Sequence, residues 1–185
     1  NIDDKNYVEK IKNLKNLPQG IENSLKTEEL IQIFAKDFLS AKGSMFLGRG
    51  SSFPIALEGA LKLKELSYLH AEGYPAGEMK HGPLALIEDG LPVIILAPKD
   101  KYFEKTISNM QEVIARGGKV LLISDKHDEV INENIRFKIE MPFIDELLNP
   151  FLLTIPLQLL AYHVALLKKC DIDKPRNLAK SVTVE

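Results

Sequence analysis

The sequence predicts an α/β domain, a three-layer αβα sandwich built around a mostly parallel sheet. Residues 44–48, 93–97 and 120–124 are largely apolar along their whole length, and residues 137–141 form a fourth candidate strand. Longer segments with apolar residues at helical spacing separate them. Strands that are apolar on both faces and alternate with helices are typical of a parallel sheet covered by helices on both sides.

Helices are expected between and around these strands. The expected helical segments are residues 27–39, 52–69, 101–116 and 149–169. Pro54 suits the first turn of the second helix, and Gly117 can end the third. Residues 1–25 are polar and rich in lysine, and Pro18 and Gly20 interrupt their short amphipathic stretches. This first segment is therefore expected to be an entry helix or a linker.

Composition argues against several classes of function. The 185 residues include 24 basic and 26 acidic side chains, and the net charge of −2 gives no general attraction for nucleic acid or an anionic membrane. No stretch approaches the ~20 apolar residues of a membrane span. The one cysteine, Cys170, excludes an internal disulfide and a multi-cysteine metal site, and it fits a cytoplasmic location. The first residue is Asn1 rather than Met, which suggests an excised or processed chain.

Residues 48–52 (GRGSS) connect the first expected strand to the following helix. Ligands gather at the carboxyl ends of the strands in sheets of this kind. Glycines allow a ligand to approach the backbone, and serine hydroxyls with free helix amides suit a phosphate. The same residues would equally form a tight turn in which Ser52 caps the helix.

The helix after this loop carries Glu58, Lys62 and Glu65 at positions i, i+4 and i+7. Their side chains share one face, while small and apolar residues form another. The pattern fits ion pairs on a solvated helix face. It also fits a carboxylate base with an electrostatic partner.

Two further segments carry candidate residues. Residues 72–83 contain three glycines and two prolines, which predicts an irregular loop that displays Glu78, Lys80 and His81. An unperturbed histidine titrates near neutrality and suits proton transfer, although a loop histidine is often simply exposed. The C-terminal tail includes Lys180, which would by default be solvated.

These motifs together resemble one family. Residues 46–87 (FLGRGSSFPIALEGALKLKELSYLHAEGYPAGEMKHGPLALI) are similar to the second sugar-isomerase (SIS) domain of isomerising glutamine–fructose-6-phosphate aminotransferase, also called glucosamine-6-phosphate synthase. The ending KPRNLAKSVTVE resembles the last residues of the same family, and LQLLAYHVAL resembles the helix before them. The resemblance extends from about residue 40 to residue 185.

The resemblance implies a flavodoxin-like SIS fold and the conversion of fructose 6-phosphate to glucosamine 6-phosphate. It implies that Lys180 forms a Schiff base with C2 of the sugar and that Glu65 moves a proton between C1 and C2. It also implies that His81 of a neighbouring subunit assists ring opening and that Lys62 is a charged partner near the reacting end. An imine at C2 acidifies the adjacent C–H bond, which a carboxylate can then deprotonate. No metal, pyridoxal phosphate or nicotinamide cofactor is implied.

The resemblance also sets expectations for organisation. It divides the chain into an N-terminal helix or linker (1–25), an SIS domain (26–170) and a catalytic tail (171–185). It implies a homodimer. It also implies that the glutaminase and the first SIS domain of the enzyme are missing from this chain, so the chain alone is expected to be inactive. Arg49 stands where a phosphate-binding loop more often has Ser or Thr, and substrate phosphate is therefore not assigned to residues 48–52.

Two other interpretations of the sequence remain open. The first is a non-catalytic sugar-phosphate-binding or dimerisation module, and the second is a free-standing sugar-phosphate isomerase. The tail argues against the first, because a sensor does not need a Schiff-base lysine.

Overall fold

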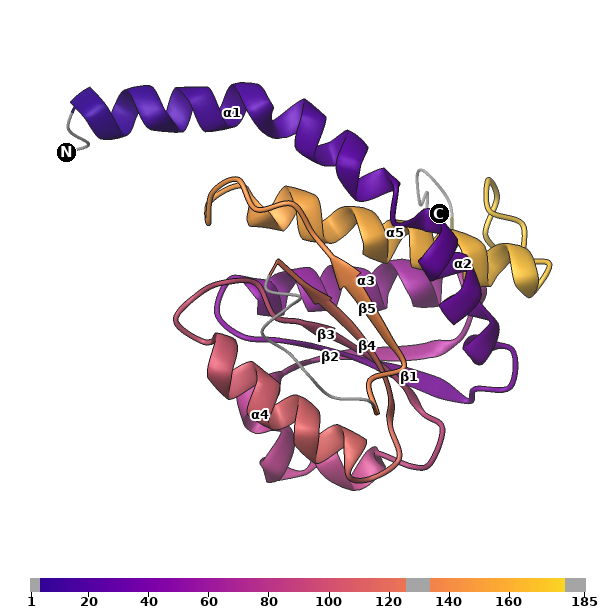
Figure 1. Ribbon diagram of the computed structural model, residues 1–185. Helices are drawn as coiled ribbons and strands as arrows, with labels where there is room; N and C mark the ends of the chain where they lie inside the picture. Colours follow the sequence, from indigo (N-terminus) through magenta and orange to yellow (C-terminus); the bar gives the residue numbers. More distant parts are fainter. Residues whose placement is uncertain (1–3, 126–133, 179–185) are drawn as a thin grey trace, which may run out of the picture.

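The computed structural model describes residues 4–125 and 134–178. Its centre is a five-stranded sheet in the order β2-β1-β3-β4-β5, in which every neighbouring pair of strands is parallel (Figure 1). The strands are β1 (Gly43–Gly48), β2 (His70–Pro75), β3 (Pro92–Leu96), β4 (Lys119–Ser124) and β5 (Phe137–Glu140). The parallel sheet expected from the sequence is confirmed.

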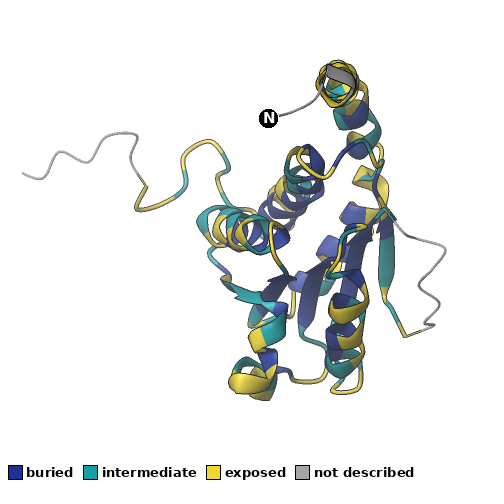
Figure 2. Ribbon diagram, turned by 90° about the vertical axis from the view of Figure 1, so that its left-hand side faces the viewer, coloured by how far each residue is buried: buried dark blue, intermediate teal, exposed yellow. Residues whose placement is uncertain are grey.

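Helices cover both faces of the sheet, and the expected three-layer sandwich is confirmed (Figure 2). One face is covered by α2 (Glu28–Ala35), η1 (Lys36–Phe38), α3 (Ser52–Ser67) and α5 (Asn149–Leu167). The other face is covered by α4 (Phe103–Ile114) and the short 3-10 helices η2 (Ala76–His81) and η3 (Pro83–Leu86).

Alternate residues of each central strand belong to two separate cores. Phe46 of β1 packs in the core with α2, α3 and α5, whereas its neighbours Met45 and Leu47 pack in the core with α4 and η2. Successive side chains of a strand point to opposite sides of the sheet. Both sides of β1 are therefore buried, which explains why its sequence is apolar without alternation.

β2 corrects the expectation of an irregular loop over residues 72–83. It pairs with β1 along its whole length, from Gly43 opposite His70 to Gly48 opposite Pro75. As an edge strand it is only partly buried, so its sequence lacks the continuous apolar run of the central strands. Gly73 lets α3 approach the strand, because a Cβ there would lie 2.9 Å from the backbone of Leu57.

α1 (Asp4–Leu25) is one continuous helix, although Pro18 and Gly20 were expected to interrupt this segment. Its first half extends beyond the sheet, and the helix bends towards the body in its second half (Figure 1). A proline inside a helix is a usual cause of such a bend. Gly20 permits close packing, because a Cβ there would lie 2.5 Å from Cδ1 of Ile144 and 3.1 Å from Cδ2 of Leu152.

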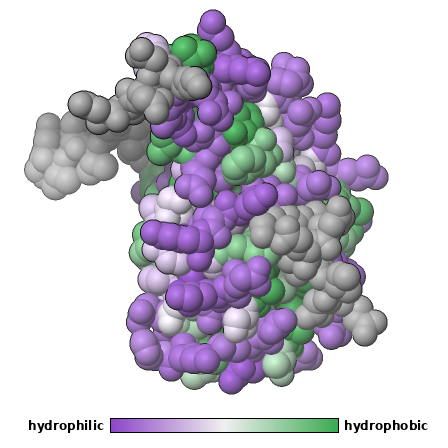
Figure 3. Space-filling model, turned by 60° about the vertical axis from the view of Figure 1, so that its left-hand side comes forward, coloured by the Kyte–Doolittle hydropathy of each residue, from purple (hydrophilic) through white to green (hydrophobic). Residues whose placement is uncertain are grey.

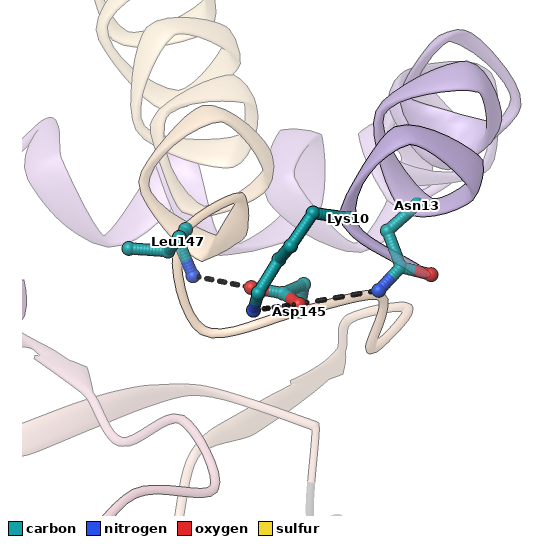
Figure 4. A network of polar contacts seen from close by, with 4 residues as sticks. All are labelled: Lys10, Asn13, Asp145 and Leu147. Carbon is teal, nitrogen blue, oxygen red and sulfur yellow. Dashed lines mark hydrogen bonds and ion pairs between the residues drawn. The ribbon is translucent and has the colours of Figure 1, made fainter. Parts of the chain in front are cut away.

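A buried carboxylate also links α1 to the segment before α5 (Figure 4). Asp145 accepts hydrogen bonds from Lys10 Nζ at 2.5 Å, from Asn13 Nδ2 at 3.1 Å and from the backbone N–H of Leu147 at 2.9 Å. The Lys10 ammonium is the main reason that the pKa of the Asp145 carboxyl lies below its ordinary value. This contact joins residues that are 135 positions apart in the chain.

α5 comes closer to a membrane span than the sequence analysis allowed. Among the described residues it is long and apolar enough to cross a membrane by length and composition, yet half of the relevant window is buried inside this fold. Its buried side packs against α2 and α3. Several of its large apolar side chains, including Phe151, Tyr162 and Leu166, nevertheless remain exposed.

Some large apolar side chains remain exposed. The face in Figure 3 is mainly hydrophilic, with smaller apolar areas between the polar side chains. Leu30 and Ile33 of α2 are about 40% exposed, whereas Ile31 and Phe34 of the same helix are buried. Further exposed apolar residues lie on α1, at Tyr7, Val8, Ile11 and Leu14.

Candidate active site

Glu58, Lys62 and Glu65 form a charged group on α3. Lys62 Nζ lies 2.7 Å from Oε2 of Glu65 and 3.8 Å from Oε1 of Glu58. The hydrogen bond with Glu65 is the main reason that the pKa of Lys62 is raised. Lys62 therefore stays protonated at neutral pH and holds the Glu65 carboxylate in place. Two carboxylates and one ammonium give the group a net charge of −1.

The opposite side of α3 is fixed on the sheet by small residues, as the sequence predicted. Ala56, Gly59 and Ala60 are buried there. A Cβ on Gly59 would lie 2.8 Å from Cδ1 of Leu157 and 2.9 Å from Cδ1 of Phe46, so only glycine permits this spacing. Lys62 and Glu65 consequently project from a helix that is closely packed on its other side.

The location of this group differs from the expectation that site residues gather at the carboxyl ends of the strands. α3 begins at Ser52, after the carboxyl end of β1, and runs back until Ser67, just before the amino end of β2. Glu65 lies in the last turn of this helix. Lys62 and Glu65 are therefore near the amino edge of the sheet, whereas residues 48–52 are at the carboxyl edge.

Residues 48–52 form a tight turn between β1 and α3, in which Gly50 has a φ of +53°. The expected capping role of Ser52 is wrong. The N-cap residue is Ser51, and no side-chain hydrogen bond caps this helix. The Ser52 hydroxyl is buried and has no hydrogen-bond partner among the described residues.

η2 follows β2 at the carboxyl edge and presents Glu78 and His81. Ala76 and Met79 anchor it in the core, while the side chains of Glu78 and His81 are 60% and 71% exposed. Nδ1 of His81 lies 2.5 Å from Oε2 of Glu78, as expected where Nδ1–H donates to the carboxylate. The other ring nitrogen, Nε2, takes no part in this contact.

Two polar links attach η2 and its surroundings to α4. Lys80 Nζ lies 2.9 Å from Oε1 of Glu112. Arg49 donates to Oδ1 of Asn109 at 2.8 Å from Nη2 and at 3.3 Å from Nε. The Arg49 guanidinium also covers Gly77, where a Cβ would lie 3.0 Å from it. Arg49 thus connects β1, η2 and α4, which agrees with leaving residues 48–52 unassigned to substrate phosphate.

Within one chain, Glu65 and His81 lie at opposite edges of the sheet. Glu65 precedes β2 at the amino edge, and His81 follows β2 at the carboxyl edge. The strand between them has six residues, and at about 3.3 Å per residue it separates the two edges by about 17 Å. Glu65 and His81 therefore do not meet within a single chain, and the elements that carry them cover opposite faces of the sheet.

The remaining predicted site residue, Lys180, lies outside the described residues. The described tail ends at Leu178, and most of its residues are exposed (Figure 2). The backbone N–H of Arg176 donates to the hydroxyl of Tyr68 at 2.8 Å, and the guanidinium carbon lies 4.1 Å from the centre of the Tyr68 ring. Sequence reasoning missed Tyr68, because its position directly after α3 carries no motif of its own.

Comparison with known proteins decides the family. The SIS domain family matches residues 37–168. The chain belongs to the SIS domain family. Curated relatives of this SIS chain include the isomerizing glutamine–fructose-6-phosphate aminotransferase of Salmonella typhi, 54% identical over 172 residues, and that of Brucella melitensis, 50% identical over 185 residues. These alignments cover 93% and 100% of this chain but only 28% and 30% of the relatives.

Solved structures agree with this family. The C-terminal domain of glucosamine-fructose-6-phosphate aminotransferase from Francisella tularensis is 44% identical with a TM-score of 0.89, over 93% of this SIS chain and 48% of that chain. Glucosamine-6-phosphate deaminase from Thermotoga maritima is 27% identical with a TM-score of 0.68, over 94% of this chain and 49% of that one. The resemblance to the aminotransferase family is confirmed, for a segment that spans about 30% of those enzymes.

Among residues 4–125 and 134–178, no group of three or more His, Cys, Asp or Glu side chains is arranged to hold a metal ion.

Proposed function

We propose that this SIS chain is the part of an isomerizing glutamine–fructose-6-phosphate aminotransferase that converts fructose 6-phosphate into glucosamine 6-phosphate. The observation that carries the proposal is the pairing of Glu65 with Lys62 at 2.7 Å on the last turns of α3, next to the contact between Tyr68 and the tail. A carboxylate with a fixed cationic partner is suited to moving a proton. The described tail contacts this end of the sheet at Arg176. The candidate nucleophile, Lys180, follows four residues later in the sequence.

In the proposed reaction Lys180 acts first. Its amine adds to the C2 carbonyl of the open-chain sugar, and loss of water leaves an imine. Ammonia released from glutamine then displaces the lysine from C2 and leaves a C2 imine of the sugar. Glu65 removes a proton from C1, which the imine has acidified, and a proton is returned to C2. The products are an aldehyde at C1 and an amine at C2, which is glucosamine 6-phosphate.

His81 is proposed to assist ring opening in the site of a second copy of the chain. The separation of about 17 Å along β2 supports this, since His81 and Glu65 of one chain are too far apart to act on the same sugar. The exposure of His81 and Glu78 on η2 also suits a surface that meets another subunit. The chain is accordingly proposed to act as a homodimer.

The activity of the whole enzyme requires more than this chain. The relatives are about three times longer, and we propose that their remaining length supplies the glutaminase and the first SIS domain, which holds the sugar phosphate. The chain alone is therefore proposed not to make glucosamine 6-phosphate from glutamine. The proposed reaction uses no metal or organic cofactor, takes place in the cytoplasm and involves neither nucleic acid nor a membrane.

Trapping with sodium borohydride tests this function. Reduction in the presence of fructose 6-phosphate should leave one stable sugar-phosphate adduct on the full-length enzyme, detected by intact mass and mapped to Lys180. Lys180→Arg should lose the adduct and the isomerisation while glutamine hydrolysis continues. A non-catalytic binding module would bind the sugar phosphate without forming any adduct. An adduct at another lysine, or unchanged trapping by Lys180→Arg, would refute the assignment.

A further inference from the structure

Tyr68 has an unusual backbone conformation for its residue type. It follows the last residue of α3 with φ of +58° and ψ of +15°, and its N–H closes the helix on the carbonyl of Lys64 at 3.1 Å. Helices commonly end with a residue in this left-handed region, and glycine is the residue that adopts it without steric cost. A bulky aromatic residue there is an outlier, and strained backbone conformations cluster at functional sites.

The side chain of Tyr68 has one clear use in the structure, which is to hold the C-terminal tail. Its hydroxyl accepts the backbone N–H of Arg176 at 2.8 Å, and its ring lies 4.1 Å from the Arg176 guanidinium carbon. A guanidinium at this distance over an aromatic ring is attracted by the ring electrons. One side chain thus contacts both the backbone and the side chain of the same tail residue.

Two local features lead the tail to this contact. The thiol of Cys170 approaches the carbonyl of Ser67 at 3.9 Å, which places the end of α5 beside the end of α3. Asp171 then accepts the backbone N–H groups of Asp173 and Lys174 at 3.0 and 2.9 Å and so turns the chain. Because most of the described tail is exposed, these contacts rather than burial determine its course.

The contact is made at the end of the helix that carries Glu65. Glu65 lies in the last turn of α3, and Tyr68 caps that helix three residues later in the sequence. Lys180 is four residues after Arg176, and four residues of extended chain span at most about 14 Å. Covalent chain length alone therefore keeps residue 180 within that span of Arg176, the residue that Tyr68 contacts.

We propose that Tyr68 is a positioning residue that docks the C-terminal tail on the end of α3 that carries Glu65. The consequence for catalysis rests on the proposed function, in which Lys180 and Glu65 act on adjacent carbons of one sugar. The docking itself does not rest on it. Tyr68 does not touch the reacting atoms, and its effect on the reaction is exerted through the tail.

Two effects of Tyr68→Gly, on the melting temperature and on the attachment of the tail, separate this role from a purely structural one. Tyr68→Gly removes the ring but suits the left-handed conformation better, so the melting temperature should stay the same or rise. The tail should nevertheless be released. Tyr68→Phe keeps the ring and loses the hydroxyl acceptor, and it should give an intermediate effect. Lys169→Gly is the matched control, because Lys169 is an exposed residue with φ of +56° at the end of α5 and is not part of the ring contact.

The docking is tested on the chain itself by amide hydrogen exchange, followed residue by residue by NMR. The Arg176 amide should exchange at least about tenfold faster in Tyr68→Gly than in the wild type, and within about twofold of the wild type in Lys169→Gly. Equal exchange in the wild type and Tyr68→Gly would overturn the proposal. An equal rise in Lys169→Gly would also overturn it, because the effect would then not come from the Tyr68 ring.

The catalytic consequence is tested on the full-length enzyme by the rate of borohydride trapping. A displaced nucleophile should slow trapping and kcat by about tenfold or more in Tyr68→Gly, with little change in KM for the sugar phosphate, whose phosphate is bound elsewhere. Unchanged trapping with faster Arg176 exchange would overturn the positioning role. If the wild-type enzyme forms no adduct, the proposed function fails, and the exchange experiment still decides whether Tyr68 docks the tail.

Discussion

The contact between Asp145 and α1 should contribute a measurable and pH-dependent part of the stability. The carboxylate is 9% exposed and accepts three hydrogen bonds, from Lys10, Asn13 and the backbone of Leu147. Hydrogen bonds to a charged group contribute about 1.5–3 kcal/mol each. Lys10 is 36% exposed, so solvent screens its contribution. Asp145→Asn keeps an acceptor but loses the charge, and we expect it to lower the free energy of unfolding by about 2 kcal/mol at pH 7.

The direction of the pH dependence follows from the lowered pKa of Asp145, which is caused mainly by Lys10. The unfolded chain has the ordinary aspartate pKa of about 3.9. A group whose pKa is lower in the folded state stabilises the fold above its unfolded pKa, and this stabilisation is lost as the pH falls through the folded pKa. The difference between the wild type and Asp145→Asn should therefore be complete near pH 7 and should decrease below about pH 4.

Thermal unfolding followed by far-UV circular dichroism measures this effect in a protein without tryptophan. For a chain of this size about 2 kcal/mol corresponds to a decrease of about 4–8 °C in Tm. Glu146→Gln is the matched control, because it removes the same charge from the exposed neighbouring residue and should change Tm at pH 7 by less than about 2 °C. The reasoning would be refuted if Asp145→Asn had the wild-type Tm at pH 7, or if its deficit were the same at pH 3.

Three other predictions follow from the fold and the proposed reaction. Gly59→Val should lower the free energy of unfolding by about 1–3 kcal/mol in urea titrations, since its side chain would collide with Leu157 and Phe46; wild-type stability would contradict the packing of α3. Glu65→Gln in the full-length enzyme should still form the borohydride adduct but should not exchange the C1 proton with deuterated solvent, and retained exchange would exclude Glu65 as the base. Light scattering at tens of micromolar should give the mass of a dimer, and a monomer alone would count against the contribution of His81 from a second copy.

The sequence was sufficient for the central elements of the fold. β1, β3 and β4 are buried on both faces, and burial of this kind requires apolar residues throughout, so these strands could be recognised without the structure. β2 was missed because it is an edge strand. Its residues form a strand through pairing with β1 and not through an apolar run that the sequence would show. Its six residues include a glycine that α3 requires and a proline at the end of the strand. Both residues normally indicate a loop.

The candidate site was predicted in its parts but not in its arrangement. Helical spacing placed Lys62 near Glu65, and the structure joins them at 2.7 Å. Their position at the amino edge follows from the direction of α3, which the general preference for carboxyl edges did not anticipate. The pairing of Glu78 with His81 and that of Tyr68 with Arg176 depend on side-chain conformations, the second across 108 residues. A single sequence contains no signal for a contact of that range.

The proposed division of the site between α3 and the tail would have a physical reason. Proton transfer requires the base to be placed within a fraction of an ångström, and a side chain achieves this on a rigid element. α3 is such an element, because Gly59 and Gly73 allow it to pack against Phe46, Leu157 and β2 with no room for a Cβ. A nucleophile that must release its product has the opposite requirement, since it has to approach and leave the sugar in each cycle. Under the proposed function, a nucleophile on the tail that Tyr68 contacts at Arg176 would meet that requirement.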